Sequence, residues 1–286
     1  MSSHINRKAN LISFSGMTTR LVHCANEPGQ EFGGVSATLD FSTTFAQPAP
    51  GQPVVFDYSR CGNPTRLALE RQLACMEKTK FAFACGSGMG AHITLANLCT
   101  QGDHIMCVDD VYGGTQRYLR MILGPNTGIK VDFSDFSDIK KFKSMLTPKT
   151  KLVWLETPTN PTLKVFDIAA ISKAIKESGS KALFVVDNTF SSPVNSNPTT
   201  LGADVTMNSM TKYIGGHSDL LGGSIHLNDR ALYDRIFFVL KSMGTGLAPF
   251  DSWLALRSAK TLELRVNAAQ KNAMAIAQTL EKSPKV

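Results

Sequence analysis

The segment 209–219 reads SMTKYIGGHSD and places one lysine, Lys212, between two hydroxyl side chains, Ser209 and Thr211, and a pair of glycines. The residues just before it, 203–208, predict a strand, so Lys212 is expected in the turn that follows. A partly desolvated lysine forms a Schiff base with an aldehyde. The hydroxyl groups can bind a phosphate, and the glycines allow close backbone approach to a flat group. A pyridoxal phosphate (PLP) site needs this combination, although a surface lysine in a polar loop would show the same pattern.

Short apolar runs alternate with helical patterns along the chain. The sequence predicts strands over 81–84, 105–108, 151–155, 182–186, 203–208 and 225–227, and helices over 66–76, 168–178 and 232–242, with a further helix that ends at Leu98. This order predicts an α/β fold with a doubly wound, mostly parallel sheet and helices on both faces. Ligands of such sheets bind at the carboxyl ends of the strands. Asp187 follows the strand 182–186 and can therefore reach the same edge as Lys212, although an aspartate there is more commonly a cap or a turn residue.

A glycine turn lies between the strand 81–84 and the helix that ends at Leu98, where residues 85–91 read CGSGMGA. Such a turn binds anions because unpaired N–H groups and the helix dipole point at the ligand. Its spacing also satisfies a relaxed dinucleotide-binding fingerprint. Asp109 and Asp110 then follow a strand about where that fold places its ribose-binding acid. The same geometry serves any phosphate, so this motif alone leaves PLP and a dinucleotide both open.

A second candidate for anion binding lies at 56–65, which reads FDYSRCGNPT. Tyr58 and Arg60 alternate along an extended piece and project the same way. This arrangement would give a phosphate a guanidinium fork beside a phenol. A turn with an incidental surface arginine explains the pattern equally well. Thr65 is expected to cap the helix that follows.

The composition narrows the class of protein. The chain has 286 residues, of which 43% are hydrophobic and 19% charged, as in an ordinary globular protein. Its net charge of +7 is not gathered into blocks, so nucleic acid is not an expected partner. No leader or membrane span is expected, which predicts a cytoplasmic location. The cysteines form no C-x-x-C pair and are expected to be free thiols, and the histidines lack metal-ligand spacing, so no metal site is expected.

The sequence also predicts a division of the chain. Residues 1–45 are short on helical periodicity and predict an extended N-terminal arm. Residues 46–245 are expected to form one large domain. Residues 246–286 are expected to form a connecting helix and the start of a further domain, with a single amphipathic helix from about Ser252 to Glu281.

Five motifs occur along the chain in the order YSRCGNPT, DDVYGGTQRY, LVWLETPTNPT, VVDNTF and SMTKYIGGHSD. Together they resemble the PLP-dependent enzymes of cysteine and methionine metabolism (fold type I), and within that family the cystathionine γ-lyase branch. The resemblance covers the chain from about residue 14 onward. It implies PLP as cofactor, a homotetramer, and cleavage of cystathionine to cysteine, 2-oxobutyrate and ammonia, with cysteine desulfhydration as a second reaction. The cystathionine γ-synthases share nearly every motif and are the closest alternative.

The resemblance implies individual roles for the residues of these motifs. Lys212 would hold PLP covalently and then act as the base at Cα. Asp187 would pair with the pyridine nitrogen, and Tyr112 would stack on the ring. Asn160 would lie near the substrate carboxylate, and Arg117 at the mouth of the pocket.

The resemblance assigns the remaining cofactor contacts to a second set of residues. In this chain they are Gly88, Met89, Thr189, Ser209 and Thr211. The backbone at Gly88 and Met89 would bind the phosphate together with the two hydroxyls that flank Lys212. Tyr58 and Arg60 would complete the phosphate site from a neighbouring subunit.

One part of the family pattern has no match in the chain. The family continues beyond the point that corresponds to Val286, and the continuation carries an arginine that grips the substrate α-carboxylate. The chain is therefore expected to be truncated, as a fragment, a gene-model end or a shortened paralogue, with little turnover of cystathionine. A catalytically silent, PLP-binding paralogue is the alternative of a different class.

Overall fold

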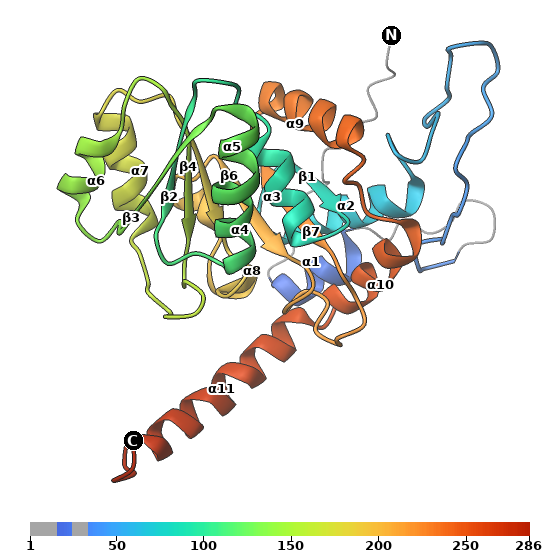
Figure 1. The fold of residues 1–286 in the computed structure, drawn as a ribbon. Coiled ribbons are helices and arrows are strands. Elements are labelled where there is room, and N and C mark those ends of the chain that lie inside the picture. The colour runs from blue at the N-terminus through green and yellow to red at the C-terminus, as the bar shows by residue number, and fades with distance from the viewer. Residues whose placement is uncertain (1–15, 25–33) are drawn as a thin grey trace.

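The computed structural model describes residues 16–24 and 34–286, which are organised around a seven-stranded sheet (Figure 1). The strands are β1 (Phe81–Cys85), β2 (His104–Val108), β3 (Lys130–Ser134), β4 (Thr150–Glu156), β5 (Leu183–Asp187), β6 (Val205–Ser209) and β7 (Gly223–Leu227). Their spatial order is β1-β7-β6-β5-β4-β2-β3. The strands from β6 to β3 pair in parallel, and β7 runs antiparallel to both β6 and β1. The predicted mostly parallel α/β fold is confirmed.

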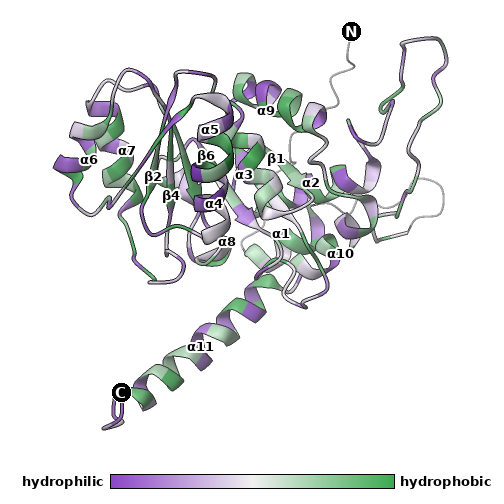
Figure 2. Cartoon of the chain, viewed as in Figure 1, coloured by the Kyte–Doolittle hydropathy of each residue, from purple (hydrophilic) through white to green (hydrophobic). Residues whose placement is uncertain are grey.

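Both faces of the sheet are covered by apolar side chains. Along β1, Phe81, Phe83 and Cys85 belong to one buried cluster, while Ala82 and Ala84 belong to another. Successive side chains of a strand point to opposite faces, so the two clusters lie on opposite sides of the sheet. The hydropathy colouring in Figure 2 places the strongly apolar strands between the helices. The sheet is therefore buried on both faces, as the run of apolar strands predicts.

The helices that carry or flank the strand ends are α2 (Pro64–Met76), α3 (Gly88–Ala96), α4 (Gly113–Tyr118), α7 (Ile168–Glu177), α8 (Ser192–Asn195) and α9 (Arg230–Met243). The others are α1 (Met17–His23), α5 (Gly124–Thr127), α6 (Ile139–Met145), α10 (Pro249–Ala259) and α11 (Leu262–Leu280), with a π-helical turn η1 at Leu119–Leu123 and a 3-10 turn η2 at Pro198–Leu201. The helices predicted over 66–76, 168–178 and 232–242 are present with ends within two residues of the predicted ones.

The start of α2 differs from the predicted one. The side chain of Asn63 caps the helix by accepting hydrogen bonds from the N–H groups of Thr65 and Arg66, at 2.9 and 3.1 Å. The prediction of Thr65 as the cap is therefore wrong. Proline is well suited to the first helical position because it has no N–H to satisfy. Pro64 therefore begins the helix, and the residue before it, Asn63, is the cap. The Thr65 hydroxyl instead donates to the Thr38 carbonyl at 2.8 Å.

The C-terminal helical pattern is divided into two helices. The predicted single helix from Ser252 to Glu281 is wrong, because α10 ends at Ala259 and α11 begins at Leu262. Leu262 and Val266 are buried at the start of α11, whereas most of the helix beyond them is exposed and extends away from the body (Figure 1). The apolar residues keep a spacing of 3.6 residues across this break. The spacing therefore does not reveal that the helix axis changes direction there.

The predicted N-terminal arm contains a helix. Residues 1–15 and 25–33 lie outside the described part of the chain, but α1 packs on α2 with Leu21 buried. The Leu21 carbonyl accepts a hydrogen bond from Gln72 at 2.5 Å, and the Thr18 N–H donates to Glu263 of α11 at 2.9 Å. This part of the arm is therefore docked against the body rather than extended.

The packing of α1 on α2 also pairs two cysteines, since Cys24 and Cys75 form a disulfide. The expectation of free thiols throughout is wrong for this pair, which is 51 residues apart in sequence and has no spacing motif. Cys85, Cys99 and Cys107 are free thiols, as predicted.

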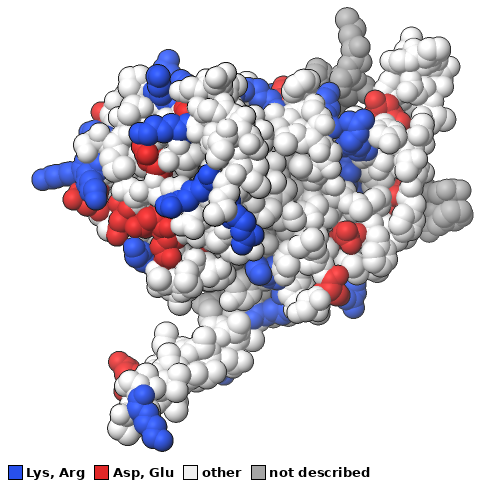
Figure 3. Space-filling model, viewed as in Figure 1, with Lys and Arg blue, Asp and Glu red and all other residues white. Residues whose placement is uncertain are grey.

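The surface view shows lysine and arginine side chains scattered over the visible face, with the largest group of acidic side chains on the left of the view and others scattered elsewhere (Figure 3). Of the helices within residues 16–24 and 34–286, none combines the length and the apolar character that a membrane crossing requires.

Candidate active site

A cavity of about 150 Å³ lies where β2, β4, β5 and β6 end. It is lined by Ser87, Gly88, Met89, Tyr112, Thr115, Glu156, Asn160, Asp187, Thr189, Phe190, Met207, Ser209, Thr211, Lys212 and Leu221. Most of the residues that the sequence assigns to a cofactor or substrate thus lie around one cavity, because the ends of parallel strands meet at one edge of a sheet.

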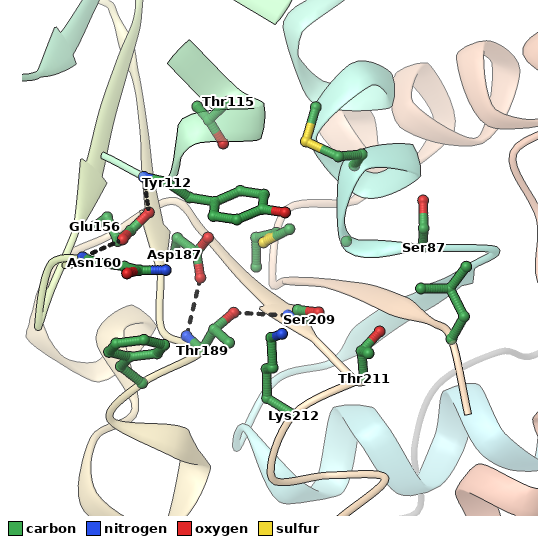
Figure 4. A pocket seen from close by; sticks show the side chains of 15 residues that line it. Ser87, Tyr112, Thr115, Glu156, Asn160, Asp187, Thr189, Ser209, Thr211 and Lys212 are labelled. Atoms are coloured by element: carbon green, nitrogen blue, oxygen red, sulfur yellow. Dashed lines mark hydrogen bonds between the residues drawn. The ribbon is translucent and has the colours of Figure 1, made fainter. Parts of the chain in front are cut away.

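Lys212 and Asp187 face this cavity together (Figure 4). Asp187 is the last residue of β5 and is 7% exposed, and its carboxylate accepts a hydrogen bond from the Thr189 N–H at 2.9 Å. Burial raises the pKa of this carboxyl above its usual range. Lys212 stands in the turn after β6, where its N–H donates to the Ser209 carbonyl at 3.2 Å. The cavity therefore contains a primary amine and, in Asp187, a desolvated carboxyl that would benefit from a cationic partner.

The glycine pair after Lys212 supports the turn rather than the cavity. Gly216 has φ +69°, a backbone conformation that favours glycine, and a side chain on it would collide with the Arg265 guanidinium. Arg265 donates to the carbonyls of Tyr213 and Ile214 and so fixes the turn from α11. A Cβ on Gly215 would lie 2.8 Å from the Met210 carbonyl oxygen. The expectation that these glycines let the backbone approach a flat group is therefore wrong, since neither lines the cavity.

The N-terminus of α3 closes another side of the cavity. The Ser87 side chain caps this helix by accepting a hydrogen bond from the Gly90 N–H at 2.9 Å. A Cβ on Gly88 would lie 3.0 Å from the Ser209 Cβ, so glycine allows the helix start and the end of β6 to approach closely. The Thr189 hydroxyl accepts a hydrogen bond from the Ser209 N–H at 2.7 Å. Backbone N–H groups and hydroxyls thus converge at one place, as a phosphate requires.

Glu156 is a cavity residue that the sequence analysis does not identify. It is the last residue of β4, is 5% exposed, and accepts hydrogen bonds from the N–H groups of Tyr112 at 3.0 Å and Asn160 at 2.7 Å. Burial, and then the nearby charge of Asp187, raise the pKa of this carboxyl to about 8. The Glu156 side chain therefore joins the loop that carries the Tyr112 ring to the loop that carries the Asn160 amide. Its place at a strand end, like that of Asp187, was the available signal.

Three predicted site residues do not line the cavity of their own chain. The Arg60 guanidinium donates to the Lys241 carbonyl at 2.7 Å and lies 5.3 Å from the centre of the Tyr58 ring. Arg117 lies on α4 with its side chain exposed. The cavity also includes residues to which the sequence analysis assigned no role, namely Ser87, Thr115, Phe190, Met207 and Leu221.

Asp109 and Asp110, the candidate ribose-binding acids of a dinucleotide site, instead contact the loop that follows β4. Asp110 accepts hydrogen bonds from the hydroxyls of Thr159 and Thr162, which lower the pKa of its carboxyl. Asp109 forms an ion pair with Lys164 at 3.7 Å. Neither lines the cavity beside α3, so the glycine turn lacks the acid that a dinucleotide-binding site would place there.

The donor set of the cavity fits PLP. The Lys212 amine can condense with an aldehyde, the Asp187 carboxyl can pair with a ring nitrogen, and the Tyr112 ring offers a flat surface above that space (Figure 4). The cradle of Gly88 and Ser209 at the α3 N-terminus suits the phosphate. The fold and the site together define a PLP-dependent enzyme of fold type I.

Comparison with known proteins gives the family. The model of the Cys/Met metabolism PLP-dependent enzymes matches residues 18–286, and the chain belongs to this family, whose cofactor is PLP. It is 44% identical to a probable cystathionine gamma-synthase of Herpetosiphon aurantiacus, over 95% of this chain and 84% of the relative. It is also 44% identical to the cystathionine gamma-lyase of Homo sapiens, over 95% of this chain and 67% of the relative.

Solved structures agree with this family. The crystal structure of metB from Corynebacterium glutamicum superposes with a TM-score of 0.92 at 39% identity and covers 95% of this chain and 70% of that one. The cystathionine gamma-lyase of Lactobacillus plantarum, complexed with L-serine, superposes with a TM-score of 0.89 at 38% identity and covers 94% and 70%. The dinucleotide alternative is thereby set aside.

Proposed function

We propose that the protein is a carbon–sulfur lyase that cleaves cystathionine by γ-elimination to cysteine, 2-oxobutyrate and ammonia, and that it also desulfhydrates cysteine. The observation that carries the proposal is the convergence of Lys212, Asp187 and Tyr112 on one cavity, in a chain 44% identical to cystathionine gamma-lyases. A cystathionine γ-synthase remains the nearest alternative, because a probable synthase is equally similar.

Each residue has a task that its position supports. Bound PLP supplies a conjugated ring that withdraws electrons from the substrate Cα. The Lys212 Nζ removes the Cα proton and, on its flexible stem, carries protons between Cα and Cβ. Asp187 holds a proton on the pyridine nitrogen through a charge-assisted hydrogen bond, and Tyr112 covers the ring face. Asn160 orients the substrate carboxylate with its side-chain amide, and Arg117 acts at the pocket mouth.

The cofactor phosphate is assigned to the opposite side of the cavity. The N–H groups of Gly88 and Met89 donate to it from the start of α3, where the helix dipole favours an anion. The hydroxyls of Ser209, Thr211 and Thr189 add hydrogen bonds from β6 and the end of β5. Within residues 16–24 and 34–286, no lysine or arginine besides Lys212 lines the cavity, so the described part of the chain supplies no cation to this part of the site.

We therefore propose that Tyr58 and Arg60 act on the cavity of a neighbouring subunit and that the assembly is a homotetramer. Tyr58 is 43% exposed in the single chain, as a residue that meets a partner should be. Light scattering of the purified protein is expected to give the mass of four chains. A monomer that retains PLP at full occupancy would contradict the assembly, because its phosphate would then be held without Arg60.

The function is tested by supplying L-cystathionine with PLP and measuring 2-oxobutyrate with a coupled dehydrogenase. Residues 1–286 alone are expected to release it slowly, because no arginine in them is assigned to the substrate α-carboxylate. The release should disappear in Lys212→Ala. A synthase would instead form cystathionine from cysteine and an activated homoserine ester. PLP binding without either reaction would contradict the lyase and favour a silent paralogue.

A further inference from the structure

A buried carboxylate lies behind the cavity, at the end of α2. Glu77 is fully buried and accepts hydrogen bonds from three asparagine amides. Asn208 donates to Oε1 at 2.7 Å, Asn188 donates to the same oxygen at 3.2 Å, and Asn197 donates to Oε2 at 3.2 Å. Among the described residues no lysine, arginine or histidine forms an ion pair with it. A charge without a counter-ion is expensive to bury, so this arrangement calls for a reason beyond stability.

The positions of two of these asparagines supply a reason. Asn188 directly follows Asp187, which faces the cavity at the end of β5. Asn208 directly precedes Ser209, which faces it at the end of β6. Neighbouring residues of an extended chain point to opposite sides, so each pair places one side chain in the cavity and the other on Glu77. The Oε1 atom of Glu77 thus joins the end of β5, which carries Asp187, to the end of β6, which carries Ser209.

The surroundings hold this junction rigidly. The Asn188 N–H donates to the Met207 carbonyl at 2.8 Å, and its amide also donates to the Ser196 carbonyl at 2.9 Å. On the other side, Asn208 contacts the buried ring of His226 at 3.4 Å, and Ser224 hydrogen-bonds the same ring nitrogen at 2.8 Å. A network of this kind fixes the residues in front of it as the outer partners of metal ligands fix a metal site.

We propose that Glu77 is a positioning residue of the cofactor site, which sets the register of Asp187 against Ser209 through the amides of Asn188 and Asn208. This inference rests on the proposed roles of Asp187 and Ser209. Glu77→Met keeps the length of the side chain but has no carboxylate oxygen to accept a hydrogen bond. The amides of Asn188 and Asn208 then lose the acceptor that joins them.

The test measures PLP binding directly. Apoprotein is titrated with PLP, and the dissociation constant and the pH midpoint of the visible absorbance band are measured alongside the unfolding temperature. Glu77→Met is expected to raise the dissociation constant about tenfold and to shift the pH midpoint by about half a pH unit. The matched control is Asn197→Ala, which removes an amide from the same carboxylate but does not adjoin a cavity residue. It should lower the unfolding temperature and leave the dissociation constant within about twofold of the wild type.

Two results would overturn the proposal. One is a Glu77→Met protein that unfolds at a lower temperature yet binds PLP with unchanged affinity and pH midpoint. The other is an equal loss of affinity in both variants, which would mean that the network acts only through general stability. If Glu77→Met does not fold, Asn208→Ser leaves the carboxylate with two amide donors and must show the same loss of affinity. Failure of the wild type to bind PLP at all would contradict the proposed function instead.

Discussion

Lys212→Ala is expected to abolish the absorbance band that bound PLP gives near the border of the visible and ultraviolet, and to reduce 2-oxobutyrate release by about 10³-fold or more. The band depends on the covalent link between the lysine amine and the cofactor aldehyde. Among the residues that the structure describes, the cavity has no second lysine that could replace it. The loss should exceed that of any other single substitution, because the same amine also moves the protons.

Lys241→Ala is the matched control for this variant. Lys241 is a partly exposed lysine outside the cavity, with its amine 5.2 Å from the centre of the Phe237 ring. Its substitution should leave the band and the release of product near wild type. A band that survives in Lys212→Ala, or that disappears in Lys241→Ala, would show that the cofactor is attached elsewhere.

Asp187→Asn is expected to reduce kcat by about 10²–10³-fold and to shift the absorbance maximum of bound PLP. Asparagine can still accept the hydrogen bond from the Thr189 N–H, so the local fold should persist. It cannot offer a negative charge to a protonated ring nitrogen. The ring would then lose its proton and with it most of its capacity to withdraw electrons. Steady-state kinetics and absorbance spectra of the two proteins measure this effect.

Asp204→Asn provides the comparison. Asp204 also carries a carboxylate that accepts a backbone hydrogen bond beside β5, from the Phe184 N–H at 2.8 Å, but it does not line the cavity. It should retain the spectrum and kcat of the wild type. An Asp187→Asn enzyme that keeps kcat within a few-fold of the wild type would remove Asp187 from the mechanism.

The central part of the fold could be predicted because its signals are local. Short apolar runs ending in polar residues marked β4, β5 and β6, and the parallel order brought their ends to one edge. Asp187 and Lys212 were placed together by this rule alone. β3 was not anticipated, since its half-exposed residues alternate too weakly to stand out from a loop.

The sequence predictions fail for features that depend on contacts between distant segments of the chain. The break between α10 and α11 leaves no mark in an apolar period, and the disulfide joins cysteines without a spacing motif. Gly216 is required by Arg265, which lies 49 positions further along the chain. Glu156 and Glu77 act through backbone N–H groups and amides that only the folded chain brings near them. Glu77 carries no motif that sequence reasoning could use, and Glu156 is marked only by its place at the end of a strand.

The roles proposed for the cavity residues all depend on attachment of PLP to the amine of Lys212. The most direct measurement is reduction of the loaded protein with borohydride, followed by proteolysis and mass spectrometry of the peptides. If PLP is attached to Lys212, a stable pyridoxyl phosphate adduct is expected on the peptide that contains this lysine, at close to one per chain. An adduct located mainly on another lysine, or spread over several, would contradict it.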